Sequence, residues 1–391
     1  MKSRSLVFVA ALCAACFGDD NVTTLVETGG SRPTVAITQA GAMLVAWVES
    51  GNVLLARSEN ARDFARMRVN DIDGDAAAHD QAPAQVAAAP DGSIYVVWQN
   101  NTRVEGRRFP YSNVRFARSV DGGLTFESAI TVNDDADGPP ASHTFHSIAA
   151  APDGTIYIAW IDGRASAGHE DHHGGGPGPQ IRVTRSTDGG KSFSPSVLVA
   201  EEACPCCRTS LAAGRNGEVA LAWRSVRDGD VRDIVVARST DGGSTFSAPV
   251  IVHDDGWRID GCPHAGPSIA YDGAGNLHAA WYTGREDGPG IFHVVSTDGG
   301  ASFGPAAALV TRASLPASLV SLAADEEGAV WAAWDDKRAD PARVQLARVD
   351  QGGVSRVART VGRTPSIASG YGRQLLAVLD GEAVRVWTTM K

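Results

Sequence analysis

Two short stretches of the 391-residue chain combine residue types that bind soft metal ions or form disulfides. Residues 204–207 read Cys-Pro-Cys-Cys, and residues 262–264 read Cys-Pro-His. Thiolates and imidazoles are the ligands that Cu(I) and Zn prefer in proteins. The proline that follows the first cysteine of each stretch restricts the backbone that carries the ligands. The two stretches therefore predict a thiol-based site, provided that the fold brings them together.

Three interpretations of this thiol-based site stay open. The first is a soft-metal centre that holds Cu or Zn. The second is disulfide formation, with Cys262 bonded to Cys204 or Cys206, or with a vicinal bond between Cys206 and Cys207. The third is a redox-active or nucleophilic thiol that a neighbouring histidine activates.

An apolar segment that ends in tryptophan recurs along the chain and must position these stretches. The tryptophans are separated by 51, 62, 63, 58 and 53 residues, and a seventh segment at 374–379 lacks one. A short apolar run precedes each segment, and further short runs follow it. Four short strands in each repeat are typical of a β-propeller blade. The tryptophans are Trp47, Trp98, Trp160, Trp223, Trp281 and Trp334.

A second repeated motif reads Ser-x-Asp-Gly-Gly-x-Thr/Ser-Phe, and it occurs at residues 119–126, 186–193, 239–246 and 296–303. Its two glycines allow the positive φ angles of a tight chain reversal. Its aspartate can accept hydrogen bonds from the backbone N–H groups of the turn. We therefore interpret the aspartates as structural residues of hairpin corners. They are Asp121, Asp188, Asp241 and Asp298.

This motif resembles the Asp box, or BNR repeat, of the sialidase-like β-propellers. The resemblance implies an all-β propeller of four-stranded blades whose box turns lie away from the active site. We count seven blades, with six as the alternative because the sialidases proper have six. Residues 17–391 then form a single domain. Residues 21–26 supply the missing outer strand of the last blade and so close the ring.

The links between blades and the loops between the second and third strands share one face of such a propeller, here called the link face. The opposite face, which carries the box turns, is the box face. An alignment of the links places Cys204 level with Cys262, and Cys206 level with His143 and His264. We therefore expect thiols and imidazoles to converge at the channel mouth. The candidate metal ligands are Cys204, Cys206, Cys207, Cys262, His264, His143 and His146.

Arginine recurs four residues after the tryptophan of several blades, where it could bind a carboxylate or phosphate on the link face. The alternative for a position repeated in this way is a structural tie within each blade. With Arg208 of the cysteine-bearing link, the candidate ligand-binding residues are Arg164, Arg227 and Arg285. Residues 169–173 read His-Glu-Asp-His-His and form either a metal-binding lid or an unliganded surface loop.

Whether this propeller is a working sialidase stays open. The resemblance implies three arginines on a substrate carboxylate, a Tyr–Glu nucleophile pair and an aspartic acid. The family's first arginine lies in a Phe-Arg-Ile-Pro motif, whereas residues 31–33 here read Ser-Arg-Pro. Glycoside hydrolysis needs two carboxyl groups at a set separation in one site, and the sequence does not nominate such a pair. The leading hypothesis is a non-sialidase propeller that binds a metal or a ligand. The alternatives are an exo-sialidase-like hydrolase of acidic glycans and a cell-surface interaction module.

The first 16 residues predict export. Lys2 and Arg4 precede an apolar run, and residues 13–16 read Cys-Ala-Ala-Cys. This resembles a bacterial lipobox with Cys16 as the lipidated residue, so we expect a periplasmic or cell-surface lipoprotein. The formal net charge of −10 and the absence of a basic stripe argue against nucleic-acid binding. We expect a monomer that meets the membrane through its lipid anchor alone and binds a small ligand, a glycan or a protein.

Overall fold

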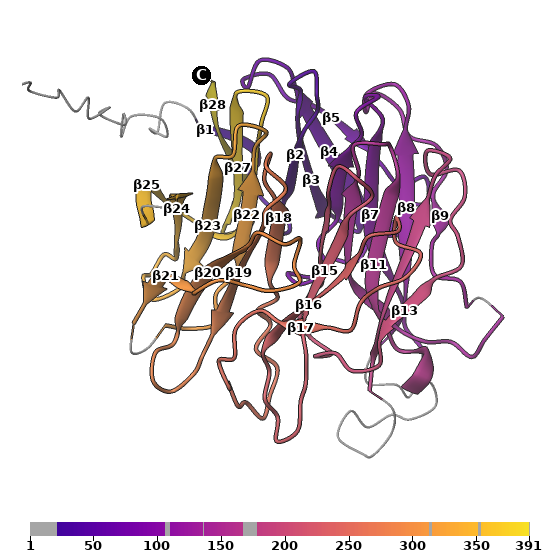
Figure 1. The fold of residues 1–391 in the computed structure, drawn as a ribbon. Helices are drawn as coiled ribbons and strands as arrows, with labels where there is room; N and C mark the ends of the chain where they lie inside the picture. The colour runs from indigo at the N-terminus through magenta and orange to yellow at the C-terminus, as the bar shows by residue number, and fades with distance from the viewer. Residues whose placement is uncertain are drawn as a thin grey trace, which may run out of the picture.

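Seven four-stranded antiparallel sheets, placed in a ring, make up the part of the chain that the computed structural model describes (Figure 1). The described residues are 22–105, 110–135, 137–166, 178–312, 315–350 and 353–390. The prediction of a seven-bladed β-propeller is therefore confirmed. The export segment with Cys16 and the histidine-rich residues 169–173 lie outside the described residues.

Each blade uses four strands, from the channel outward. The first strands are β2 (Thr34–Ile37), β6 (Gln85–Ala88), β10 (His143–Ala150), β14 (Ser210–Ala213), β18 (Ser268–Tyr271), β22 (Val320–Ala324) and β26 (Arg363–Gly370). The second strands are β3 (Met43–Glu49), β7 (Ile94–Thr102), β11 (Ile156–Asp162), β15 (Val219–Arg224), β19 (Leu277–Thr283), β23 (Val330–Asp336) and β27 (Arg373–Asp380). The third strands are β4 (Asn52–Ser58), β8 (Tyr111–Ser119), β12 (Gln180–Ser186), β16 (Ile234–Ser239), β20 (Gly290–Ser296), β24 (Arg343–Asp350) and β28 (Ala383–Met390). The outer strands are β5 (Ala65–Arg68), β9 (Ile130–Thr131), β13 (Val197–Ala200), β17 (Val250–Ile251), β21 (Ala307–Thr311), β25 (Gly353–Val361) and β1 (Val22–Val26).

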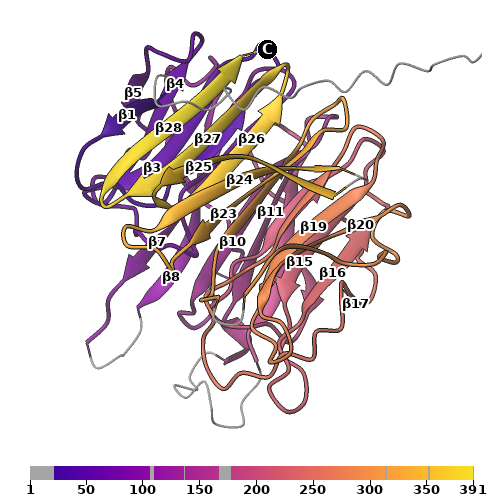
Figure 2. The same cartoon turned by 90° about the vertical axis from the view of Figure 1, so that its left-hand side faces the viewer.

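The ring is closed by strands from the two ends of the chain. β1 pairs antiparallel with β28, with Val22 opposite Trp387 and Thr24 opposite Arg385, so the first described strand completes the last blade. Figure 2 shows these two strands side by side. The first strands of neighbouring blades contact one another around the channel, and β26 contacts β2. This closure fixes where the inter-blade links meet, because each link leads directly into a channel-lining strand.

The second strands are the buried centre of each blade. β11 is buried at all seven of its positions, and the six repeated tryptophans are no more than 1% exposed. Strands covered on both sides need apolar residues on both faces, which is why these segments read as runs rather than alternations. Truncating a buried aromatic side chain costs about 3–5 kcal/mol, so these tryptophans hold neighbouring blades in register.

The box turns are closed by their own aspartates. In the turn after β12, Asp188 Oδ1 accepts the backbone N–H groups of Lys191 and Ser192, each at 3.0 Å. The Ser192 hydroxyl donates to Asp188 Oδ2 at 2.6 Å, and these bonds hold the pKa of Asp188 well below its usual value. Gly190 has a φ of 83°, and a Cβ there would lie 2.7 Å from the Phe116 ring of the preceding blade. Corresponding bonds are made by Asp121, Asp241 and Asp298.

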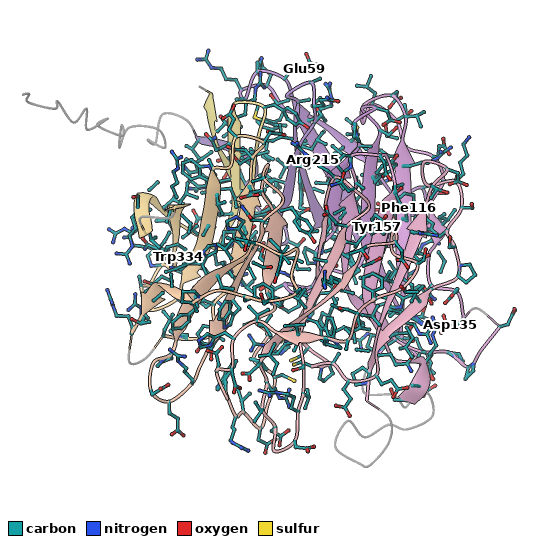
Figure 3. The ribbon with its side chains drawn as sticks, in the orientation of Figure 1. Glu59, Phe116, Asp135, Tyr157, Arg215 and Trp334 are labelled. Carbon is teal, nitrogen blue, oxygen red and sulfur yellow. The ribbon has the colours of Figure 1, made fainter. Side chains whose placement is uncertain are left out.

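The two faces of the ring carry different kinds of connection. In Figure 3, Glu59 and Arg215, which lie in turns of the box face, are in the upper part of the view, and Asp135, in the link before β10, is at its lower right. The Cys204 N–H donates to the carbonyl of Arg224 at 2.8 Å, which joins a link to the end of a second strand on the link face. Among the described residues, no helix is long and apolar enough to cross a membrane.

Candidate metal centre

Three thiols form a compact group in the link before β14. The Cys204 sulfur lies 3.5 Å from those of Cys206 and Cys207, which are 4.0 Å from each other. All three side chains are at most 5% exposed. Sulfurs joined in a disulfide are about 2.05 Å apart. Sulfurs around one tetrahedral metal ion, with bonds of about 2.3 Å, are about 3.8 Å apart. The thiol spacing therefore fits metal ligands, and the cysteines among the described residues are all free.

A second group joins the two cysteine-bearing stretches. The sulfurs of Cys206 and Cys262 and a ring nitrogen of His264 lie within 4.8 Å of one another. Cys262 and His264 are exposed, whereas Cys206 is buried. His264 has a φ of 50°, a left-handed backbone conformation that is uncommon outside glycine. The convergence of residues 204–207 with residues 262–264 is thus present in the fold.

Arg224, at the end of β15, ties the two stretches together. Its Nη2 donates to the carbonyls of Ala265 and Tyr282 at 2.8 and 2.7 Å, and its Nη1 donates to the carbonyl of Arg232 at 2.6 Å. Its own carbonyl accepts the N–H of Cys204. Arg224 is 1% exposed, so these are buried charge-assisted hydrogen bonds. Arg224 therefore holds the link at 262–266 through its side chain and the link at 204–207 through its backbone carbonyl.

Gly266 lets the two links touch. A Cβ at this position would lie 2.5 Å from the carbonyl oxygen of Arg208 and 3.0 Å from its nitrogen. Backbone cannot yield to such a contact without moving the whole link. The absence of a side chain at Gly266 is therefore a condition for the approach of Cys262 and His264 to Cys206.

The guanidinium of Arg232 places positive charge beside the thiols. Arg232 is 7% exposed, and its Nη1 lies 3.4 Å from the sulfur of Cys204. Contact with the sulfurs of Cys206 and Cys207, reinforced by the Arg232 guanidinium, lowers the pKa of Cys204. Burial raises the pKa of Cys207. Without a cation, the group thus favours a single thiolate, at Cys204. A bound cation would stabilise the thiolate forms of the other two cysteines as well.

His143, which the sequence placed with the cysteines, lies in a different group. Its Nε2 is 2.8 Å from Asp135 and 3.6 Å from Asp162, and its Nδ1 is 2.8 Å from the carbonyl oxygen of Ser112. Burial opposes the charged ring, but the contacts with Asp135 and Asp162 raise the pKa of His143. Since Arg164 also pairs with Asp162, this group is a network of ion pairs between blades 2 and 3.

His146 also lies apart from the thiols. It is fully buried, and its Nε2 is 2.9 Å from the carbonyl oxygen of Pro83. Desolvation lowers its pKa to about 4, so the ring is neutral at physiological pH. The structure therefore brings together five of the seven candidate ligands, namely Cys204, Cys206, Cys207, Cys262 and His264, and leaves His143 and His146 outside.

The repeated arginines are engaged with carboxylates of their own face. Arg164 pairs with Asp134 and Asp162, Arg227 with Asp233 and Asp254, and Arg285 with Asp255 and Asp287. Arg208 differs, because it is 7% exposed and donates through Nη2 to the carbonyl of Val320 at 2.7 Å. Its Nη1 has no hydrogen-bond partner among the described residues. Among the described residues, Arg208 is thus the one of these four candidates that forms no ion pair with a carboxylate.

A cavity of about 530 Å³ opens at the channel mouth beside the thiol groups. His264 lines it, together with His79, Asp80, Lys337 and Arg363. The rings of His79 and His264 are 6.3 Å apart between centroids. A ligand in this cavity would therefore lie next to His264, an exposed member of the second donor group.

Comparisons with known proteins bear on the fold. No protein-family model matches the chain, and no curated protein sequence matches it. A polysaccharide lyase of family PL25, an ulvan lyase, is 12% identical, with a TM-score of 0.61 over 94% of this chain and 95% of that chain. A Hadza microbial sialidase is 15% identical, with a TM-score of 0.53 over 91% of this chain and 74% of that chain. An α-L-arabinanase from Penicillium chrysogenum is 10% identical, with a TM-score of 0.53 over 93% of each chain.

These similarities support a propeller of the kind found in sialidases, and they extend the likeness to polysaccharide lyases and an arabinanase. At such low identity they concern the fold, because propellers of one architecture carry many unrelated sites.

The sequence analysis missed the residues that support the thiols. Arg224 directly follows the blade-4 tryptophan, at a position that is Val48, Gln99, Ile161 and Tyr282 in four other blades. A charged residue at a position that is uncharged in most blades, beside a cysteine-bearing link, is the signal that could have found it. Arg232 and Gly266 carried no such signal, because their roles depend on how two distant links meet.

Proposed function

We propose that this protein is an exported propeller that binds a soft metal ion, copper or zinc, at the link face. The observation that carries the proposal is the spacing of the three buried sulfurs, 3.5, 3.5 and 4.0 Å. A cation bound between these sulfurs would stabilise all three as thiolates. The lipidation at Cys16 and the export that it implies belong to the same proposal.

The donor set supports a soft ion rather than calcium or magnesium. Both groups that contain Cys206 consist of thiols and one imidazole, and neither includes a carboxylate. Hard cations take oxygen ligands, whereas copper(I) and zinc take sulfur and nitrogen. The exposed Cys262 and His264 give an ion a path from solvent to the buried thiols.

Metal analysis combined with thiol titration tests this proposal. We expect protein purified without oxygen from copper- or zinc-supplemented cells to retain metal through dialysis. After acid release of that metal, the four cysteines of the propeller should react with a thiol reagent. Protein that carries no metal and no reactive thiol would instead contain disulfides, and the proposal would be wrong.

The cavity supports a second candidate function, the binding of an acidic glycan. Lys337 and Arg363 line it, at 3.7 Å from Asp335 and 3.3 Å from Asp80, and both are partly exposed to the cavity. The buried guanidinium of Arg32 lies nearby, with its Nη1 2.5 Å from the carbonyl oxygen of Asp80. Cationic groups in a concave site suit carboxylated or sulfated sugars. One of the similar structures is an ulvan lyase bound to a GlcA–Rha3S oligosaccharide.

Calorimetric titration with acidic oligosaccharides tests this second candidate. We expect uronic-acid or sulfated oligosaccharides to bind, and the double variant Lys337→Gln/Arg363→Gln to bind them at least about tenfold more weakly, since each charged contact contributes about 1 kcal/mol or more. Neutral oligosaccharides of equal length serve as the control. Equal affinity for neutral and acidic sugars would contradict the assignment, and release of a fluorogenic sialoside leaving group would extend it to hydrolysis.

A further inference from the structure

We propose that the metal centre holds two Cu(I) ions that share the thiolate of Cys206. This inference rests on the proposed function and specifies its stoichiometry and its metal. The inner ion would be bound by Cys204, Cys206 and Cys207, and the outer ion by Cys206, Cys262 and His264.

The distribution of donor atoms points to two ions rather than one. Among the described residues, the donor groups that contain sulfur are two groups of three, each within 4.8 Å, and Cys206 is the member that they share. A single tetrahedral ion needs four donors around one point. A sulfur anion has several lone pairs and can bind two metal ions at once. Cys206 is therefore placed to bridge.

The number of donors in each group favours copper(I) over zinc. Structural zinc sites are almost always four-coordinate, and five donors that share a sulfur cannot complete two such shells. Copper(I) is a soft ion that thiolates select, and three donors from sulfur and nitrogen satisfy it. The same residues would thus accept two copper ions but one zinc ion.

The surrounding charges fit this assignment. Two Cu(I) ions and four thiolates carry a formal charge of −2, since the imidazole of His264 binds in its neutral form. The Arg232 guanidinium lies 3.4 Å from the Cys204 sulfur, and the buried Arg224 interacts electrostatically with Cys207. These two guanidiniums offset negative charge at the buried inner ion.

The burial of the two groups differs and should make the two ions distinguishable. All three inner ligands are buried, whereas two of the three outer ligands are exposed. A chelator in solution reaches the outer ion directly but reaches the inner one only after the link moves. We therefore expect release of the two ions in two phases, with the outer ion leaving first.

Anaerobic titration of the full-length protein with Cu(I), in competition with a coloured Cu(I) chelator, tests the proposal. We expect saturation at two Cu(I) per chain, and saturation at one with Zn²⁺. The double variant Cys262→Ser/His264→Ala removes the exposed ligands and should bind one Cu(I). The matched control His79→Ala removes an imidazole of the same cavity that belongs to neither group, and it should still bind two.

The outcomes separate this inference from the function on which it rests. Wild-type protein that binds no metal overturns the proposed function itself. Wild-type protein that saturates at one Cu(I) leaves metal binding in place and overturns the bridged pair. A drop to one Cu(I) in His79→Ala would show that the outer ligands are wrongly assigned. Far-ultraviolet circular dichroism of each metal-free variant confirms that it is folded.

Discussion

Replacing Cys206 by serine should weaken the binding of copper(I) or zinc at least about 100-fold. Changes in residues that merely orient a metal ligand typically cost 10–100-fold in affinity, so the loss of a ligand shared by both donor groups should exceed that range. Serine keeps nearly the size of cysteine, and the metal-free protein should therefore keep its fold. Competition with a chelator of known affinity measures the change.

Two further variants test whether the effect of Cys206→Ser comes from the loss of a shared ligand. Pro205→Ala alters the same link but leaves every thiol in place, so its affinity should stay within a few-fold of wild type. Cys262→Ser removes a ligand of the outer group alone and should weaken binding less than Cys206→Ser. Equal affinities for Cys206→Ser and wild type would mean that the thiol groups are not the metal site.

The second large effect is expected for Arg224→Met, which should lower the free energy of unfolding of the metal-free protein by about 3 kcal/mol. The substitution removes hydrogen bonds to the buried carbonyls of Ala265, Arg232 and Tyr282. A buried acceptor left without a donor costs about 1–3 kcal/mol, and relief of the buried charge offsets part of the sum. The Arg224 guanidinium also lies 4.9 Å from the centroid of the Trp257 ring, and that contact is lost as well.

Urea unfolding monitored by tryptophan fluorescence measures the effect of Arg224→Met. Arg215→Met is the matched control, because Arg215 is exposed on the box face and the same chemical change there should shift the midpoint little. Since the Arg224 side chain holds the link that carries Cys262 and His264, its variant should also bind metal more weakly. An unchanged midpoint together with unchanged metal affinity would contradict the role given to this side chain.

The architecture could be predicted almost completely from the sequence, because a propeller repeats its physical requirements in every blade. Six of the seven second strands contain a buried tryptophan, so the interval between tryptophans marks the blades. The box motif marks the turn after the third strand, where Gly190 must have a positive φ and no side chain. The closure of the ring could also be predicted, because the last repeat supplies three strands and residues 22–26 provide the fourth.

The thiol site could be predicted in part. The alignment of links correctly associated Cys206 with Cys262 and His264, because blades 4 and 5 begin their inner strands at equivalent positions, Ser210 and Ser268. The same alignment misplaced His143. Blade 3 begins its inner strand at His143 itself, opposite Asp162, and a bulge between Thr144 and Ser147 absorbs the difference. A bulge leaves little trace in the sequence, and the carboxylates of Asp135 and Asp162 hold the ring there.

The supporting residues could not be predicted, since their partners lie far away in sequence. Gly266 matters because the backbone of Arg208 passes 2.5 Å from where its Cβ would be, and no local pattern encodes that approach. Arg227 and Arg285 illustrate the reverse case. Because these arginines recur at one position of the blade, we interpret them from the sequence as candidate ligand-binding residues. In the structure their guanidiniums form ion pairs with Asp233 and Asp255.

X-ray absorption spectroscopy of the copper-loaded protein at the copper K edge tests the central claim most directly. If buried thiols at the link face hold the metal, the spectrum should show a Cu(I) edge and a first shell dominated by sulfur at about 2.3 Å. That sulfur shell should be diminished in Cys206→Ser and unchanged in His79→Ala. A first shell made of nitrogen and oxygen alone, the same in wild type and Cys206→Ser, would place the metal elsewhere and contradict the account.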